Sequence, residues 1–158
     1  MSKDFFKISI LPYAAIIIKI CRAYTNTQED FEDYYQEVCL QIWRSRKNFD
    51  HNSQWSTWVY RITLNVCLTL QKKKKVITSP LESSVKTLAE EKNDSDHSEI
   101  DKLYSGIKQL SKIDRAVILL YLEEKTYQEI ATILETSPSN IGVRINRIKK
   151  KLKTLLNG

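Results

Sequence analysis

The strongest constraint on the fold is an apolar stripe near the C-terminus. Its members recur at steps of four, three, four and three, at Ile141, Ile145, Ile148, Leu152 and Leu155. This spacing places them on one face of an α-helix. Ser137 followed by Pro138 supplies a capping side chain beside a proline at the first helical position. The stripe therefore predicts a long amphipathic helix that begins at Pro138.

Two further helix starts precede this helix. Ser111 is followed by Asp114 at the spacing of a cap, and Thr126 is followed by Glu129 at the spacing of a capping box. The helix after Thr126 is short, and only residues 135–137 separate it from the striped helix. These are the proportions of a helix-turn-helix, a motif that places its second helix in the major groove of DNA.

The polar face of the striped helix carries the candidate DNA contacts. Short polar groups and arginines near its start and on its outside have the chemistry to reach base edges and phosphates. The candidates are Ser137, Ser139, Asn140, Val143, Arg144, Asn146, Arg147 and Lys150. An ordinary helical hairpin with a solvated basic face fits the periodicity equally well. The capped short turn and the one-sided arginines favour DNA.

The first half of the chain also has helical periodicity. Apolar residues follow a helical rhythm over residues 5–24 and 55–70, and Thr27 is placed to cap a helix between them. With only 3 Gly and 3 Pro in 158 residues, the chain has little material for the turns of an all-β fold. We therefore expect an all-α protein made of two small helical domains.

Charge indicates where the two domains meet. Residues 1–81 carry a net charge of +5, residues 82–101 of −5, and residues 102–158 of +6. Residues 76 to about 100 also lose the helical periodicity. We expect a first domain over residues 1–75, a flexible acidic linker over 76–101 and a second domain over 102–158. Two basic modules on one chain suggest two contacts with one polyanion.

Aromatic residues gather in the first domain beside cations, from Phe49 to Arg61. Such a combination can bind single-stranded bases, because stacking tolerates any base. Aromatic residues at helical spacing are nevertheless more often part of a core. We expect Trp58 and Ile62 to be core, and Trp55, which lies between Gln54 and Ser56, to form an exposed platform.

Catalysis finds little support in the residues. The 2 histidines, His51 and His97, fall in expected loops, and the sequence has no Gly-rich phosphate loop, paired-cysteine metal spacing or nucleophile motif. We predict no catalytic residue, no metal and no cofactor. The odd set of Cys21, Cys39 and Cys67 indicates reduced, buried thiols in a cytoplasmic protein. The apolar run over residues 8–21 is too short to span a bilayer, so we expect no membrane insertion.

Three strings in this order resemble the extracytoplasmic-function class of bacterial RNA polymerase sigma factors. The first, Asp33 to Val38 with Leu40 and Trp43, resembles the Asp-x-x-Gln-Glu-Val helix of region 2. The second, Trp55 to Ile62 with Asn65, resembles the aromatic-x-Thr-Trp-Leu-Tyr-Arg-Ile stretch that follows it. The third, from Leu110 through residues 127–131 to Leu152, resembles region 4.

The resemblance implies three binding surfaces and no enzymatic activity. A surface for core RNA polymerase would consist of Asp33, Gln36, Glu37, Leu40 and Trp43. Recognition of the promoter's minus-ten element would fall to Phe49, Asn52, Trp55, Ser56, Thr57, Tyr60, Arg61 and Asn65. The helix-turn-helix would read the minus-thirty-five element, and an anti-sigma factor is a common partner of the class. From its residues alone, the Asp33, Gln36 and Glu37 strip is by default a solvated helix face.

Several positions depart from the class pattern, and two of them lie in the helix-turn-helix. Glu135 stands where the region 4 turn usually has glycine, so the turn either avoids a left-handed conformation or tolerates strain. Gly142 stands where a basic residue usually lies, which removes a DNA contact. Two rival interpretations stay open. One is a helix-turn-helix regulator that binds an operator without polymerase, and the other is a polymerase-bound modulator that no longer opens promoters.

Overall fold

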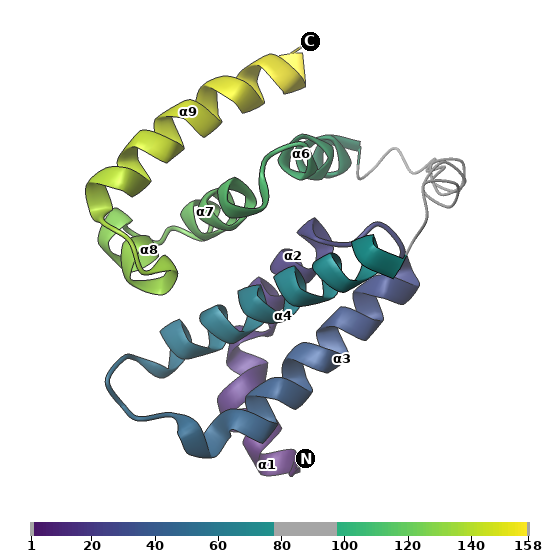
Figure 1. Ribbon diagram of the computed structural model, residues 1–158, viewed down its shortest axis with the longest axis vertical. Coiled ribbons are helices and arrows are strands. Elements are labelled where there is room, and N and C mark those ends of the chain that lie inside the picture. Colours follow the sequence, from purple (N-terminus) through teal and green to yellow (C-terminus); the bar gives the residue numbers. More distant parts are fainter. Residues whose placement is uncertain (1, 78–97, 158) are drawn as a thin grey trace.

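The chain folds into two stacked layers of helices (Figure 1). The computed structural model describes residues 2–77 and 98–157, and all regular structure within these residues is helical. The predicted all-α class is thus confirmed. Most of the expected acidic linker, residues 78–97, lies outside the described residues. No helix in the described part of the chain combines the length and apolarity needed to cross a membrane.

The N-terminal layer forms the lower half of Figure 1. Its elements are α1 (Lys3–Phe5), a π-helical turn η1 (Phe6–Ile10), a 3₁₀ turn η2 (Leu11–Tyr13), α2 (Ala14–Ala23), α3 (Gln28–Ser45), a 3₁₀ turn η3 (Arg46–Asn48) and α4 (Trp55–Ile77). The helical rhythm over residues 5–24 is thus divided among four elements. Pro12 lies at the start of η2, where its missing N–H does least harm.

The C-terminal layer contains the helix-turn-helix. Its elements are α6 (Ser98–Lys108), α7 (Lys112–Leu122), α8 (Tyr127–Leu134) and α9 (Pro138–Asn157). Helix α6 begins within the segment expected as linker. In Figure 1, α9 lies on the outer side of this layer, away from α1 to α4.

The helices begin where the sequence predicts. The hydroxyls of Thr27, Ser111 and Ser137 each accept a hydrogen bond from the backbone N–H three residues ahead, at 3.1–3.2 Å. Thr126 and Glu129 form both bonds of the capping box. The backbone N–H of Thr126, which donates to the Glu129 carboxylate, lowers the pKa of that carboxyl. Each cap stabilises its helix by about 1 kcal/mol.

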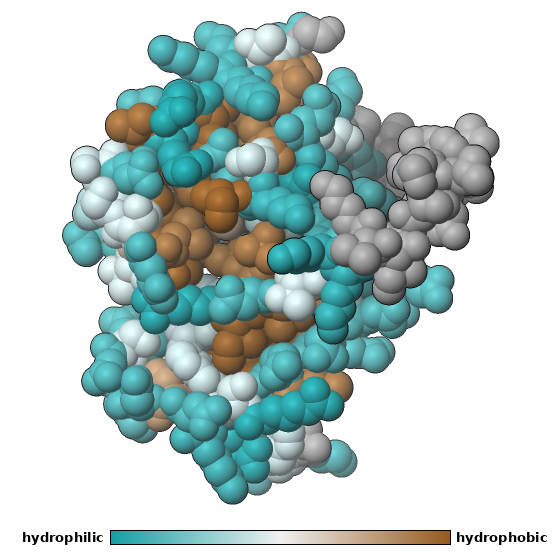
Figure 2. Space-filling model, viewed as in Figure 1, coloured by the Kyte–Doolittle hydropathy of each residue, from teal (hydrophilic) through white to brown (hydrophobic). Residues whose placement is uncertain are grey.

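The hydrophobic core runs through both layers. Ile141, Ile145, Ile148 and Leu152 are buried, as the stripe predicts, and pack against α6, α7 and α8. Ile17, Val38, Ile42 and Val59 are fully buried in the other layer. The layers also touch each other, because α4 packs on α8 and α2 on α7. On the face in Figure 2, hydrophilic residues predominate and hydrophobic ones show mainly towards the middle.

The three cysteines converge in the N-terminal core. Cys21, Cys39 and Cys67 are buried and none forms a disulfide, as predicted. The sulfur atoms of Cys21 and Cys67 lie 3.9 Å apart, and this contact together with burial raises the pKa of the Cys67 thiol. A raised pKa keeps the thiol protonated, so it behaves as a small apolar side chain.

Glu135 ends α8 in the left-handed conformation, with a φ of 59°. The turn therefore keeps the backbone shape usually given to glycine, and the N–H of Thr136 closes it by donating to the carbonyl of Ala131 at 2.9 Å. A side chain in this conformation costs roughly 1–2 kcal/mol. The strain is tolerated here.

Replacing Glu135 by glycine should remove this strain. We predict that Glu135→Gly raises the free energy of unfolding by about 1 kcal/mol, measured by urea denaturation. Glu135→Ala is the control, because alanine loses the same carboxylate but keeps the strain. If alanine stabilises the protein as much as glycine does, the gain comes from removing the charge and the strain explanation is wrong.

Candidate functional site

The outer face of α9 is the best-defined candidate surface. Of the predicted contacts with the minus-thirty-five element, those exposed to solvent are Ser137, Ser139, Asn140, Val143, Asn146, Arg147 and Lys150. They lie opposite the buried stripe, because a helix that buries one face must present the other. The structure therefore brings this predicted set together, with Arg144 as the exception.

The start of α9 is held rigidly. The backbone N–H of Asn140 donates to Ser137 Oγ at 3.1 Å, and its side-chain Nδ2 donates to Thr136 Oγ1 at 2.9 Å. The hydroxyls of Ser137 and Ser139 lie 3.4 Å apart. These bonds fix the Asn140 amide relative to the turn, so the polar groups at the helix start are arranged before any ligand arrives.

Arg144 lies differently from the prediction. Its Nη1 is 2.8 Å from the Asp114 carboxylate of α7, and its side chain is 34% exposed. Asp114 also belongs to the first turn of α7 that Ser111 caps. The ion pair turns Arg144 from the outer face towards α7, so it ties the two helices together instead of standing free.

Gly142 has a packing explanation. A Cβ atom built at this position would lie 3.2 Å from Cε2 and 3.5 Å from Cδ2 of Tyr127, the first residue of α8. A side chain at position 142 would therefore press on the Tyr127 ring, which would have to move by a few tenths of an ångström. Sequence reasoning noticed the missing basic residue and missed the ring, because the two positions are joined only by the fold.

The aromatic residues of the first domain form a packed cluster. Trp55 lies 5.0 Å from Trp58 and 5.2 Å from Phe49 between ring centroids, and Phe5 stands edge-on to it at 6.1 Å. The indole N–H of Trp55 donates to the carbonyl of Ser9 at 2.8 Å. The expectation of an exposed platform at Trp55 is wrong, because the N-terminal segment packs against this ring.

The remaining predicted minus-ten residues differ in exposure. Asn52 and Asn65 are exposed, and Asn52 bonds to Asp50 through both its backbone and its side chain at 3.0 Å. Phe49, Ser56 and Thr57 are half-buried. Tyr60 is only 6% exposed. Asn52 and Asn65 are thus the members of the set that solvent reaches freely.

Arg61 joins the two domains. Its Nη2 and Nε donate to the carbonyls of Thr132 and Ile133 at 2.5 and 3.1 Å, and its Nε lies 3.7 Å from the Glu135 carboxylate. These acceptors stand at the C-terminal end of α8, where carbonyls lack helical partners and attract cations. A residue predicted to meet the minus-ten element is therefore occupied by the helix-turn-helix.

Further contacts join the two domains next to Arg61, and together with the Arg61 contacts they form what we call the interdomain seam. Tyr24 donates its hydroxyl to the carbonyl of Lys112 at 2.6 Å, and Arg115 donates to the carbonyl of Ala23 at 3.2 Å. The Lys19–Glu123 ion pair adds a charged contact. The Lys125 ammonium lies 5.3 Å from the centre of the Tyr60 ring, and burial is the main cause that raises the pKa of this phenol. The seam covers Tyr60 and part of Arg61.

Removing the Arg61 side chain should loosen the seam. We predict that Arg61→Ala increases the radius of gyration in small-angle X-ray scattering while circular dichroism stays unchanged, because three contacts across the seam are lost together. Arg44→Ala is the control, since within residues 2–77 and 98–157 Arg44 makes one ion pair, at 3.9 Å with Glu37 on its own helix. An unchanged radius of gyration for Arg61→Ala would show that these contacts do not hold the domains together.

The predicted polymerase surface lies on α3. Asp33, Gln36 and Leu40 are exposed at spacings of three and four, so they line one helix face. Trp43 is half-buried between the Phe5 ring at 5.2 Å and the Arg46 guanidinium at 3.5 Å. The exposed part of this surface is therefore the acidic and apolar strip of Asp33, Gln36 and Leu40, with Trp43 packed at its end.

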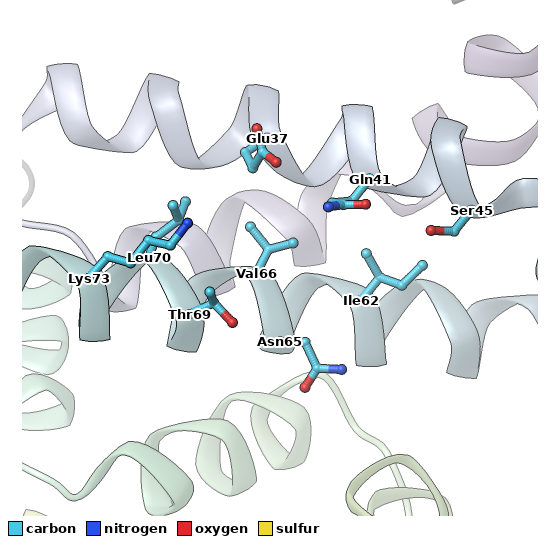
Figure 3. A pocket seen from close by; sticks show the side chains of 9 residues that line it. All are labelled: Glu37, Gln41, Ser45, Ile62, Asn65, Val66, Thr69, Leu70 and Lys73. Atoms are coloured by element: carbon cyan, nitrogen blue, oxygen red, sulfur yellow. The ribbon is translucent and has the colours of Figure 1, made fainter.

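Glu37 lies at the edge of a groove between α3 and α4 (Figure 3). The groove has a volume of about 310 Å³ and is open to solvent. Its lining combines the Glu37 carboxylate with apolar Ile62, Val66 and Leu70. Asn65 lines the same groove, so the structure brings a predicted polymerase contact close to a predicted DNA contact.

Comparison with known proteins gives a consistent result for both layers. The model of Sigma-70 region 2 matches residues 10–76, and the model of Sigma-70 region 4 matches residues 100–152. Together they account for more than half of the chain. The chain is 25% identical to the ECF RNA polymerase sigma factor SigW of Bacillus subtilis over 91% of its own length and 84% of that protein.

Other relatives match over different lengths. RNA polymerase sigma-H factor of Pseudomonas aeruginosa is 24% identical over 98% of the chain and 87% of that protein. ECF sigma factor SigG of Mycobacterium tuberculosis is 36% identical over 58 residues, which cover 37% of this chain and 16% of SigG. The chain thus spans only a small part of that relative.

Two solved structures share the fold. CnrH in complex with the cytosolic domain of CnrY has a TM-score of 0.74 and 20% identity, covering 99% of this chain and 90% of CnrH. The sigma factor RpoE in complex with the anti-sigma factor NepR, from Bartonella quintana, has a TM-score of 0.73 and 19% identity, covering 99% and 98%.

Proposed function

The chain belongs to the extracytoplasmic-function class of the sigma-70 family, and we propose that it directs core RNA polymerase to specific promoters. The observation that carries this proposal is the presence, on one chain, of an exposed acidic strip on α3 and a helix-turn-helix with an exposed polar recognition face. An operator-binding regulator needs only the second surface. The proposal places the protein in the cytoplasm, where polymerase works.

The first domain, residues 1–75, holds the factor on polymerase. Asp33, Gln36 and Leu40 meet the enzyme first because they are exposed on one face of α3, and Glu37 and Trp43 border them. Two carboxylates in this surface favour a basic partner surface, which speeds encounter and fixes its orientation.

The same domain recognises the minus-ten element. The loop at Asn52 and the outer side of α4 at Asn65 are exposed and available to bases of an opened duplex. Arg61 and Tyr60 become available only when the seam opens, because α8 and Lys125 cover them. Promoter recognition therefore includes separation of the two domains.

The second domain, residues 102–158, reads the minus-thirty-five element. The capped start of α9 enters the major groove, as in other helix-turn-helix proteins, while Arg147 and Lys150 approach phosphates. Two weak sites joined by a chain segment bind one promoter at an effective concentration that neither reaches alone.

An anti-sigma factor completes the proposed set of partners. RpoE and CnrH, which share the fold, were solved with NepR and with the cytosolic domain of CnrY. A partner that binds the packed arrangement of the two domains more tightly than the open one would keep Arg61 covered, since a ligand shifts an equilibrium by its differential affinity.

Reversing charge on the α3 strip should abolish polymerase binding. We predict that Asp33→Arg combined with Glu37→Arg lowers the affinity for core RNA polymerase by at least tenfold, because two attractive charges become repulsive. Co-purification and fluorescence anisotropy with purified core measure the loss. Circular dichroism should be unchanged, since both side chains lie at or near the surface.

The matched control places the same charge change elsewhere. Glu99→Arg with Asp101→Arg reverses two exposed carboxylates at the start of α6, in the C-terminal layer. This variant should bind core polymerase like the parent. If both double variants lose binding equally, the effect follows net charge, and the docking assignment to α3 is wrong.

Arg147 and Arg144 should behave differently in DNA binding. We predict that Arg147→Ala weakens promoter binding by the holoenzyme and lowers the slope of log K against log salt by about one. Arg144→Ala should instead lower the free energy of unfolding, because it leaves Asp114 without its 2.8 Å partner. A salt slope for Arg147→Ala equal to the parent's would remove Arg147 from the DNA interface.

A further inference from the structure

We propose that Val143 selects thymine in the minus-thirty-five element by packing against its C5-methyl group, with the Tyr127 ring beside it. This inference rests on the proposed function and specifies the base that α9 reads. Four observations on the first two turns of α9 carry it.

The first observation concerns charge. Within residues 138–145 the one basic side chain is Arg144, and it is paired with Asp114 on α7. Position 142 carries no side chain at all. The part of the recognition helix that enters deepest into a major groove therefore lacks a free cation for guanine, whose O6 and N7 are the usual acceptors for arginine or lysine.

The second observation concerns exposed apolar surface. Val143 is 51% exposed and Tyr127 is 39% exposed, although both belong to a well-packed domain. Neighbouring exposed positions are polar, among them Ser139, Asn140 and Asn146. Val143 lies on the face of α9 opposite the buried stripe, so its side chain contributes nothing to the hydrophobic core.

The third observation is the pairing of Tyr127 with Gly142. The ring lies against the helix at position 142, with Cε2 3.2 Å from the place of a Cβ atom. Residue 142 directly precedes Val143 in the helix. Glycine weakens a helix interior by about 1 kcal/mol relative to alanine, and here its absent side chain leaves room for an aromatic ring at the edge of the recognition face.

The fourth observation is rigidity. Valine is branched at Cβ and strongly prefers one χ1 rotamer in a helix, so Val143 presents its two methyl groups in a fixed direction. The helix start below it is fixed by the bonds from Asn140 to Ser137 and Thr136. Docking this surface therefore costs little conformational entropy.

The chemistry of the DNA major groove identifies the base that Val143 contacts. Base edges in the major groove carry hydrogen-bond donors and acceptors, and the thymine methyl is the apolar group they present. A rigid valine flanked by an aromatic ring matches a methyl group and leaves the O6 and N7 acceptors of guanine without a donor. Figure 1 shows α9 on the side of the C-terminal layer away from α1 to α4, and Val143 is exposed with the two domains packed together, so domain separation is not needed to reach it.

The test removes the C5-methyl groups of the thymines and changes nothing else in the DNA. A promoter fragment that the holoenzyme selects from genomic DNA is prepared with thymine or with deoxyuridine throughout the minus-thirty-five element, and the affinity of the holoenzyme for each is measured. The parent should bind the uracil DNA about fourfold more weakly, the fold-change that corresponds to ~0.8 kcal/mol for one buried methyl-sized group.

Variants then assign the effect to Val143. Val143→Ala should bind the thymine DNA about as weakly as the parent binds the uracil DNA, and it should lose nothing further with uracil. Ile113→Ala is the control, because Ile113 is 45% exposed on α7, outside the recognition helix. It should discriminate between the two DNAs as the parent does.

Each contrary outcome has its own meaning. Equal binding of the parent to thymine and uracil DNA overturns this inference and leaves the proposed function standing. Continued discrimination by Val143→Ala moves methyl recognition to another residue and also overturns it. If the holoenzyme selects no promoter fragment from genomic DNA, the proposed function fails, and the inference fails with it.

Discussion

Burial of the α9 stripe is the interaction on which the rest of the second domain depends. Because Ile141, Ile145, Ile148 and Leu152 are held against α6, α7 and α8, the orientation of α9 is fixed and its opposite face is left to solvent. The fixed orientation of α9 also determines which residues contact its two flanks. One flank lies against α7, where Arg144 pairs with Asp114, and the other lies against the Tyr127 ring, which leaves little room for a side chain at position 142. The exposed side chains near the start of α9 are short and include both polar and apolar groups. Further along the helix the exposed side chains are basic. The first half of α9 therefore suits base edges, and the second half suits phosphates.

The seam gives the two domains a relation beyond being joined by a chain segment. Arg61 donates to carbonyls at the end of α8, and Lys125 lies over Tyr60. The groups that cover Arg61 and Tyr60 across the seam therefore come from α8 and from Lys125 just before it. Under the proposed function, packing of the domains and binding of a promoter would compete for these side chains, and the energy lost on separating the domains would reduce the net affinity for DNA. A partner protein that favours the packed arrangement would lower promoter use without touching the recognition face of α9.

Local signals in the sequence predicted most of the fold. Caps at Thr27, Ser111, Thr126 and Ser137, and the stripe of α9, depend on residues within a few positions of each other, and each was found where expected. The errors at the candidate sites involve distant partners. Trp55 is covered because Ser9 and Phe5 lie against it, and Arg61 is occupied by Thr132 and Ile133. Helical periodicity shows that a residue lies on an outer flank, but it does not show which other helix covers that flank. The assignment of individual side chains to polymerase and promoter stays a prediction.

The central claim is that this chain confers promoter specificity on RNA polymerase, and run-off transcription tests it most directly. Purified core RNA polymerase, the full chain and a pool of genomic promoter fragments from its own source are combined, with core alone as the reference. The prediction is a set of discrete transcripts that appear only when the protein is present and whose upstream sequences share two elements. Association with core without any specific transcript would contradict the claim and indicate a polymerase-bound modulator. The absence of association with core would contradict it more completely and indicate a regulator that binds DNA by itself.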